Sequence, residues 1–192
     1  LRDFVTWTRA ETSGSAEVRA ERSQWAANSV LLMAQMYDDT EQPQKLLEVL
    51  DEEADKTFAA VEEGEDLVSR ARMLRLAAHA SIGGEHNDLA QQELRSILDD
   101  PKIDADLKAE AARVVGQNYV RQARRLEREA EDDPAITEAD VRAAFGKAKE
   151  SLQMSLELNP EQSADQYTEV ARTLYQAGAY EEAARTFQEL VD

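Results

Sequence analysis

The chain contains no cysteine and only two histidines, and it is poor in glycine and proline. Without cysteine it has no disulfide, no thiolate nucleophile and no cysteine zinc site, and its redox compartment is not indicated. The longest apolar run lies around residues 29–34, far short of the roughly 20 residues that a membrane-spanning helix needs. We therefore expect no direct membrane insertion, and the sequence points to no particular localisation.

Acidic residues outnumber basic ones by 40 to 22, which gives a formal net charge of −18. A charge of this sign repels phosphate backbones, so we expect no nucleic-acid partner. The excess is concentrated in residues 38–66, where twelve acids meet two lysines for a net charge of −10. A solvated acidic helix face is the ordinary interpretation of such a segment, and a docking face for a basic partner is the alternative.

Apolar residues recur throughout at helical spacing, and no stretch shows the alternation of β-branched residues that strands need. Most glycines and prolines lie where the apolar stripes break. Residues 1–10 could be the remnant of a further helix, Pro43 suits a first helical turn, and Thr137 with Asp140 resembles a capping box. The pattern predicts helices at 15–38, 43–62, 66–82, 87–99, 104–131, 137–158, 162–177 and 180–191.

The last two predicted helices carry a specific pattern of large and small residues. It comprises Tyr167, Val170, Ala171, Leu174, Gly178, Tyr180, Ala183 and Phe187. The two alanines would let the helix backbones approach closely, and we expect Tyr180 and Phe187 to fill the space beside the crossing. The pattern resembles the tetratricopeptide repeat, a helix-turn-helix unit of about 34 residues.

Less regular copies of this hairpin occur earlier in the chain. The small residue of the first helix and its counterpart in the second are twelve residues apart three times. These pairs are Ala34 with Leu46, Ala78 with Ala90, and Ala171 with Ala183. The copies depart from the family pattern, because Leu46 replaces a small residue, and Glu41 and Glu85 stand where Gly178 stands in the last copy.

The remaining copy, the third hairpin in chain order, is centred on Gly116 and is stretched. From Gly116 to Ala148 there are 32 residues instead of twelve, which lengthens each helix by about ten residues, or about 15 Å. We expect a protruding hairpin with its tip near residues 132–134.

The resemblance implies an all-α fold, an α-α superhelix (a tetratricopeptide-like solenoid) of about four antiparallel hairpins, the third with elongated arms. The hairpins would cover 15–62, 66–99, 104–158 and 162–191. We expect residues 1–192 to form a single repeat domain. Because the chain opens on a helical remnant and no polar cap follows Val191, we also expect it to be a fragment of a longer protein.

The sequence offers little for catalysis. The stretch 83–88 brings Glu85, His86 and Asp88 together, but these residues lack the i, i+4 pairing of a zinc-binding helix. A polar hairpin loop is the simpler interpretation. We predict no enzyme activity, no metal and no cofactor.

In tetratricopeptide-like stacks the first helices line a concave surface that binds peptides. Helical spacing from each small residue predicts which side chains share that face. The candidate partner-binding residues are Arg72, Arg75, His79, Arg113, Gln117, Arg121, Arg172 and Tyr175. Arginine forks suit carboxylates, so acidic groups of a partner are the natural ligands. The alternative is internal neutralisation of Arg75 and Arg113 by Glu110 and Asp165.

A second basic group belongs to the elongated hairpin: Arg121, Arg124, Arg125 and Arg128. A solvated face balanced by Glu127, Glu129 and Glu131 would explain it without any partner. Nucleic-acid binding is disfavoured here too, because no aromatic residues alternate with the arginines.

Together these features predict a non-catalytic protein-interaction module that binds a protein or peptide in a helical groove. Two alternatives stay open. The repeats could be a spacer or homo-oligomerisation segment of a larger protein, or an accessory domain of an enzyme encoded elsewhere in the chain.

Overall fold

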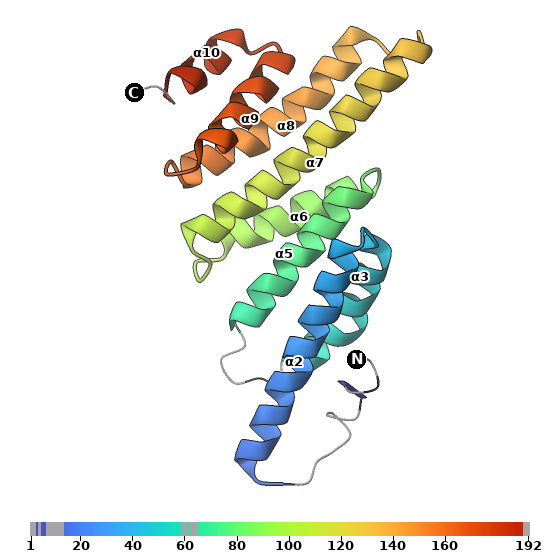
Figure 1. Cartoon of the computed structure of the whole chain (residues 1–192), viewed down its shortest axis with the longest axis vertical. Coiled ribbons are helices and arrows are strands. Elements are labelled where there is room, and N and C mark those ends of the chain that lie inside the picture. Colours follow the sequence, from blue (N-terminus) through green and yellow to red (C-terminus); the bar gives the residue numbers. More distant parts are fainter. Residues whose placement is uncertain (1–2, 4, 7–13, 59–60, 62–64, 190–192) are drawn as a thin grey trace. The chain divides into compact units, whose positions relative to one another are not determined.

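The computed structural model describes residues 3, 5–6, 14–58, 61 and 65–189. All the regular secondary structure in these residues is helical (Figure 1). No helix among them is both long enough and apolar enough to cross a bilayer. The chain divides into two compact units, Leu1–Glu93 and Leu94–Asp192.

Unit 1 begins with helix α2 (Ala16–Asp39), whose N-terminus is capped by the Ser15 hydroxyl accepting a hydrogen bond from the Val18 N–H at 3.3 Å. Helix α3 (Pro43–Val49) starts with Pro43 in its first turn, as predicted. The remaining elements are the π-helical turn η1 (Leu50–Ala54), α4 (Asp55–Phe58), α5 (Glu65–Ile82) and the first part of α6 (His86–Asp99). The helix predicted at 43–62 is thus interrupted by η1.

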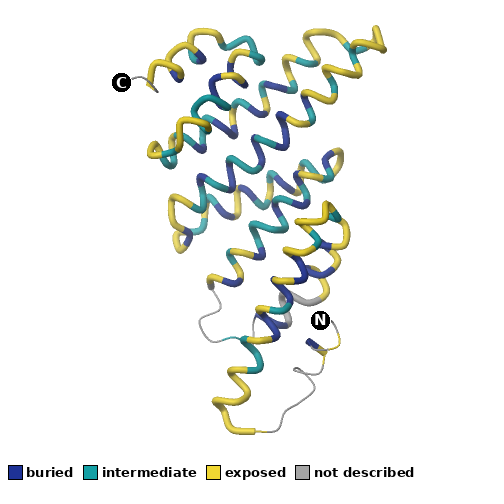
Figure 2. The backbone as a smooth tube through the Cα atoms, in the orientation of Figure 1, coloured by how far each residue is buried: buried dark blue, intermediate teal, exposed yellow. Residues whose placement is uncertain are grey.

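The core of unit 1 lies where α2 packs against α3, η1 and α5. Val30 and Ala34 of α2 are fully buried there, as are Leu46 of α3 and Leu50 of η1 (Figure 2). Ala78 of α5 belongs to the same cluster. The small residues that the sequence pattern assigned to helix crossings therefore do lie in the interior, where they permit close approach of the helices.

Unit 2 contains α7 (Ala105–Asp132), α8 (Glu138–Leu158), α9 (Ala164–Gln176) and α10 (Tyr180–Gln188). The predicted capping box is confirmed, because the Thr137 side chain accepts from the Asp140 N–H while the Asp140 carboxylate accepts from the Thr137 N–H. A second capping box joins Ser163 and Gln166 at the start of α9. Both satisfy backbone N–H groups that a helix N-terminus leaves without partners.

Helices α7 and α8 form the long hairpin that the stretched repeat predicted. They are 28 and 21 residues long, against 13 and 9 for α9 and α10. The turn between them follows Asp132, close to the predicted tip. At the other end of this pair Gly116 lies so close to Leu152 that a Cβ built on the glycine would stand 2.6 Å from the Leu152 Cγ. Glycine at this position therefore permits the helices to approach.

The last hairpin agrees with the sequence pattern in its interior and differs at its surface. Ala171, Leu174 and Ala183 are buried. Tyr180 and Phe187 were expected to fill the space beside the crossing, and this was wrong, because they are 56% and 42% exposed. Helical spacing places both on the same side of α10 as the buried Ala183, but the two larger side chains remain partly exposed.

Two expectations fall on the parts of the chain that the structure does not describe. Most of the helical remnant expected at residues 1–10 lies outside the described residues. The expectation that no polar cap follows Val191 also concerns residues outside them.

Candidate functional site

Arg75, a candidate binding residue on α5, is held inside unit 1. Its Nη2 atom lies 3.4 Å from the Asp51 Oδ1 of η1, and its Nη1 atom lies 3.8 Å from the Glu93 Oε1 of α6. The side chain is only 20% exposed. Arg72 also interacts with another residue of the chain. Neither arginine is thus free for a partner's carboxylate.

His79 of α5 contacts His86, the first residue of α6. Their Nδ1 atoms are 2.8 Å apart, and their rings stack at 5.1 Å with an interplanar angle of 28°. One ring must donate from Nδ1 and the other accept, so at least one histidine is neutral. The turn that brings them together uses Gly83 and Gly84, both at positive φ.

Burial lowers the pKa of His79, and the charge of His86 lowers it further. Asp51 acts in the opposite direction and Arg75 in the same direction as burial, both more weakly. The pair therefore favours the neutral state of His79, which suits the shared hydrogen bond. The contact between His79 and His86 and the turn formed by Gly83 and Gly84 account for the stretch 83–88 as the connection between α5 and α6. No group of three or more histidine, aspartate or glutamate side chains that could hold a metal occurs in the described part of the chain.

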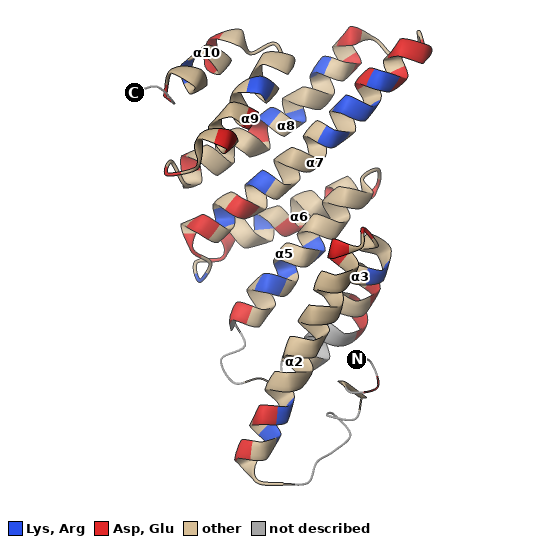
Figure 3. Cartoon of the chain, in the orientation of Figure 1, with Lys and Arg blue, Asp and Glu red and all other residues tan. Residues whose placement is uncertain are grey.

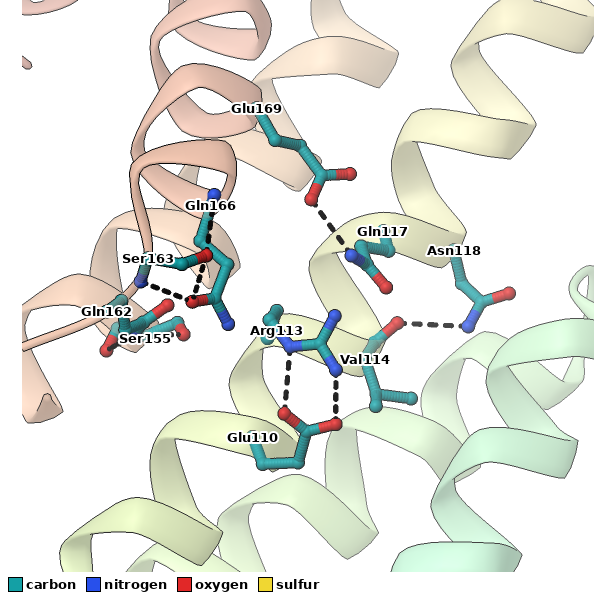
Figure 4. Close-up of polar contacts among 10 residues, drawn as sticks. All are labelled: Glu110, Arg113, Val114, Gln117, Asn118, Ser155, Gln162, Ser163, Gln166 and Glu169. Carbon is teal, nitrogen blue, oxygen red and sulfur yellow. Dashed lines mark hydrogen bonds and ion pairs between the residues drawn. The ribbon is translucent and has the colours of Figure 1, made fainter. Parts of the chain in front are cut away.

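In unit 2, the row of candidate residues on α7 begins with internally satisfied groups (Figure 4). The Arg113 guanidinium forms a two-point contact with Glu110, with Nε donating to Oε2 at 2.8 Å and Nη2 donating to Oε1. This hydrogen bonding raises the pKa of Arg113 despite partial burial. One turn later Gln117 donates from Nε2 to the Glu169 Oε2 of α9 at 2.8 Å. This last contact joins the first helices of two successive hairpins.

The internal neutralisation weighed from the sequence thus occurs, with partly different partners. Glu110 pairs with Arg113 as considered, whereas Asp51 and Glu93 pair with Arg75 in place of Asp165. These pairs are partly exposed, with arginine side chains that are 20–24% exposed, and each contributes on the order of 1 kcal/mol. Their main consequence here is that they occupy the arginine forks.

Two other candidate arginines, Arg121 of α7 and Arg172 of α9, are exposed. Neither has an acidic partner among the residues that the structure describes. Tyr175 is 63% exposed and meets Tyr180 edge to face, with ring centroids 5.2 Å apart. Arginine and tyrosine are the residue types most often found at the energetic centres of protein interfaces.

The sequence pattern missed two members of this region. Glu169 was not among the residues that helical spacing assigned to the face. Tyr180 was assigned to the interior by the repeat pattern. The Gln117–Glu169 hydrogen bond and the contact of Tyr175 with Tyr180 reveal both, and no local signal in the sequence does.

The proximity of Gly178 to Arg142 of α8 shows where the aromatic pair, Tyr175 and Tyr180, lies in unit 2. A Cβ built on Gly178, in the turn between Tyr175 and Tyr180, would lie 3.4 Å from the Arg142 Cδ. Arg142 is in the second turn of α8 and pairs with Glu138. The aromatic pair is therefore at the same end of unit 2 as the tip of the long hairpin (Figure 1).

No family model matches this sequence, and searches of curated proteins and of solved structures gave no match either.

Proposed function

We propose that this chain is a non-catalytic protein-interaction module with tetratricopeptide-like hairpins, and that it binds a segment of a partner protein along α7 and α9 of unit 2. The observation that carries the proposal is the change along one row of side chains. Arg113 and Gln117 are occupied by Glu110 and Glu169, whereas Arg121 is exposed without an acidic partner among the described residues.

The chemistry of the exposed groups is that of a binding surface. Arg121 and Arg172 offer planar forks for carboxylates or carbonyl oxygens. Tyr175 and Tyr180 offer apolar area with a polar tip, at a small cost in side-chain entropy. The Gln117–Glu169 hydrogen bond fixes α7 against α9, so that these groups are presented by helices and not by loops.

The buried small residues support the tetratricopeptide-like part of the proposal. Ala34, Ala78 and Ala171 are all inaccessible to solvent, as the family pattern requires at its helix crossings. The positive φ of Gly178, +82°, fits the residue that closes the first helix of a repeat.

The test is binding of the labelled chain to an array of synthetic peptides of varied sequence. We expect a subset of peptides to bind, and the double substitution Arg172→Gln with Tyr175→Ala to weaken that binding about tenfold. The matched control is Arg185→Gln with Phe187→Ala, which likewise removes one exposed arginine and one exposed aromatic residue, here from α10. An array without bound peptides, or equal losses in both variants, would contradict the proposal.

A second candidate function is self-association through α2. Trp25, Leu32 and Met36 are 48%, 51% and 53% exposed, and their spacing places them on one side of the helix. They lie within residues 24–37, which contain no charged side chain (Figure 3).

Sedimentation velocity at rising protein concentration tests this candidate. Self-association that Leu32→Gln abolishes would support it. A monomer over the whole concentration range would exclude it, and so would an oligomer that the substitution leaves intact.

A further inference from the structure

Four arginines lie on one side of the C-terminal half of α7: Arg121, Arg124, Arg125 and Arg128. At about 100° per residue they occupy about 100° of the helix circumference. Tyr119 and Ala123, which are buried on the α8 side of the hairpin, point in the opposite direction by the same spacing. The arginines therefore form a ridge on the outer side of the long hairpin, which we call the arm ridge (Figure 3).

The arm ridge is not neutralised within the chain. All four arginines are exposed, and none has an ion pair in the part of the chain that the structure describes. Among the residues that the structure describes, the one side-chain hydrogen bond of the group runs from the Arg128 Nε to the Arg124 carbonyl oxygen at 3.2 Å. Helical spacing directs Glu127, Glu129 and Glu131 to the flanks of the ridge.

The lower part of the same row shows what neutralisation looks like in this protein. Glu110 pairs with Arg113, and Glu169 of α9, which accepts a hydrogen bond from the neutral Gln117, also acts on the charge of Arg113. Helix α9 then ends at Gln176, about two turns after Glu169, whereas α7 continues to Asp132, about four turns after Gln117. Arg125 and Arg128 thus lie beyond the part of α7 that α9 accompanies. Arg121 and Arg124 lie within it, but residues 170–176 of α9 contain no acid.

Four adjacent cations repel one another, and they do so in a chain with 40 acidic residues and a net charge of −18. We infer that the arm ridge is a docking surface for an acidic helix of a partner protein, which supplies the carboxylates that α9 does not supply. This inference rests on the proposed function, and it extends the binding surface from the α7–α9 face along α7.

The spacing of the ridge defines what such a helix must carry. Arg121 and Arg128 are two turns apart, about 10.5 Å along the axis. A helix lying along α7 matches them when its acids stand at positions i, i+4 and i+7, on one side. The same acids placed around the whole circumference cannot reach all the arginines at once.

The test uses a synthetic, fluorescently labelled alanine-based helix with glutamates at i, i+4 and i+7, repeated over about five turns. Its partner probe is an isomer of the same composition with the glutamates spread around the helix. Fluorescence anisotropy against the full chain gives both affinities. We expect the one-sided helix to bind about tenfold more tightly than the isomer, and its binding to weaken about tenfold from low to high salt.

Two triple variants locate the binding. The first changes Arg124, Arg125 and Arg128 to glutamine, and we expect it to lose about tenfold in affinity for the one-sided helix. The second makes the same change in charge elsewhere in unit 2, through Arg142→Gln, Lys147→Gln and Arg185→Gln. We expect this control to bind as the unaltered chain does.

Three results would overturn the inference: equal binding of the two helices, equal losses in the two triple variants, or tighter binding of a single-stranded oligonucleotide than of the one-sided helix through the same arginines. If the helix does not bind while array peptides still bind through Arg172 and Tyr175, the arm ridge is not a docking surface and the proposed function stands. If the array peptides fail and the helix binds, the α7–α9 face is the part that is wrong.

Discussion

Unit 1 and unit 2 are both built from helical hairpins, but they treat their cationic side chains differently. In unit 1, Arg75 is held between Asp51 and Glu93. In unit 2, only the base of the α7 row is held in this way, by Glu110, and the arm ridge remains exposed. The difference follows from where the acids lie. Asp51 of η1 and Glu93 of α6 reach Arg75, and Glu110 reaches Arg113 from the same helix. Residues 170–176 of α9 contain no acid for the arginines further along α7.

The two units also differ at the turns of their hairpins. The turn after α2 places Glu41 at a φ of +53°, whereas the turn after α9 places Gly178 at +82°. Left-handed backbone is accessible to glycine at almost no cost and to other L-residues at about 1–2 kcal/mol. The turn after α9 therefore satisfies its backbone requirement better than the turn after α2, and substitutions should show that.

The largest expected effect is in unit 2, at the crossing of α7 and α8. Gly116→Ala would place a Cβ 2.6 Å from the Leu152 Cγ and 3.2 Å from the Leu152 backbone nitrogen. Because neither atom is the end of a flexible chain, the helices must separate, and we expect a loss of about 2–3 kcal/mol in the free energy of unfolding. Urea denaturation followed by circular dichroism measures this loss.

Gly146→Ala is the matched control for that substitution. Gly146 is also inside a helix of unit 2, but a Cβ there would meet nothing within 4 Å. We expect it to stabilise the protein by about 0.5–1 kcal/mol through helix propensity alone. A similar loss for both glycines would show that the α7–α8 crossing is looser than its geometry indicates.

The hairpin turns give the next largest effect, with opposite signs in the two units. Gly178→Ala forces an alanine into left-handed backbone, which should cost about 1–2 kcal/mol. Glu41→Gly relieves the same strain in unit 1, offset in part by the entropy of the unfolded glycine, and should stabilise by up to about 1 kcal/mol. Thermal and urea unfolding would measure the free energy of unfolding of both variants, which we expect to fall for Gly178→Ala and to rise for Glu41→Gly. Destabilisation by Glu41→Gly would mean that the glutamate makes a compensating contact.

A smaller effect is a pH dependence of local stability that we expect in unit 1 alone, because both histidines of the chain, His79 and His86, belong to unit 1. The pKa of His79 is lowered from its ordinary value of 6.5, chiefly by burial. A base with a lowered pKa contributes stability that is present above about 6.5 and is lost as the pH falls through the lower folded value. We therefore expect amide hydrogen exchange in the turn between α5 and α6 to accelerate when the pH falls from about 7.5 to about 5.5, after correction for intrinsic rates.

The double substitution His79→Gln with His86→Gln removes the titrating pair. The corrected exchange of that turn should then become independent of pH over the same window, while unit 2, which has no histidine, serves as the internal reference. Equal acceleration in both units would assign the effect to carboxylates and not to the histidine pair.

The sequence predicted the features that depend on neighbours along the chain. The start of α8 at the Thr137–Asp140 capping box, the tip after Asp132 and the length of the long hairpin all follow from local residue chemistry. Burial of Ala171 and Ala183 followed from helical spacing. These inferences need no knowledge of which helices meet.

The features that the sequence did not predict depend on helices far apart in the chain. Gln117 and Glu169 are 52 residues apart, and the Lys149–Glu182 pair of α8 and α10 is separated by 33. The π-helical turn at Leu50–Ala54 likewise has no local signature. Spacing tells which residues share a face, but only the packing tells whether the face is covered.

Substitution of Phe187 has the smallest expected effect. It also distinguishes most clearly between what the spacing of residues predicts and what the packing of the helices shows. The repeat pattern placed it inside the last hairpin, where truncation to alanine would cost about 3–5 kcal/mol. It is 42% exposed, and most of that contact energy is therefore never gained on folding. We expect Phe187→Ala to lower the free energy of unfolding by less than about 1 kcal/mol in urea denaturation. A cost near that of a buried phenylalanine would mean that in solution this side of α10 is covered.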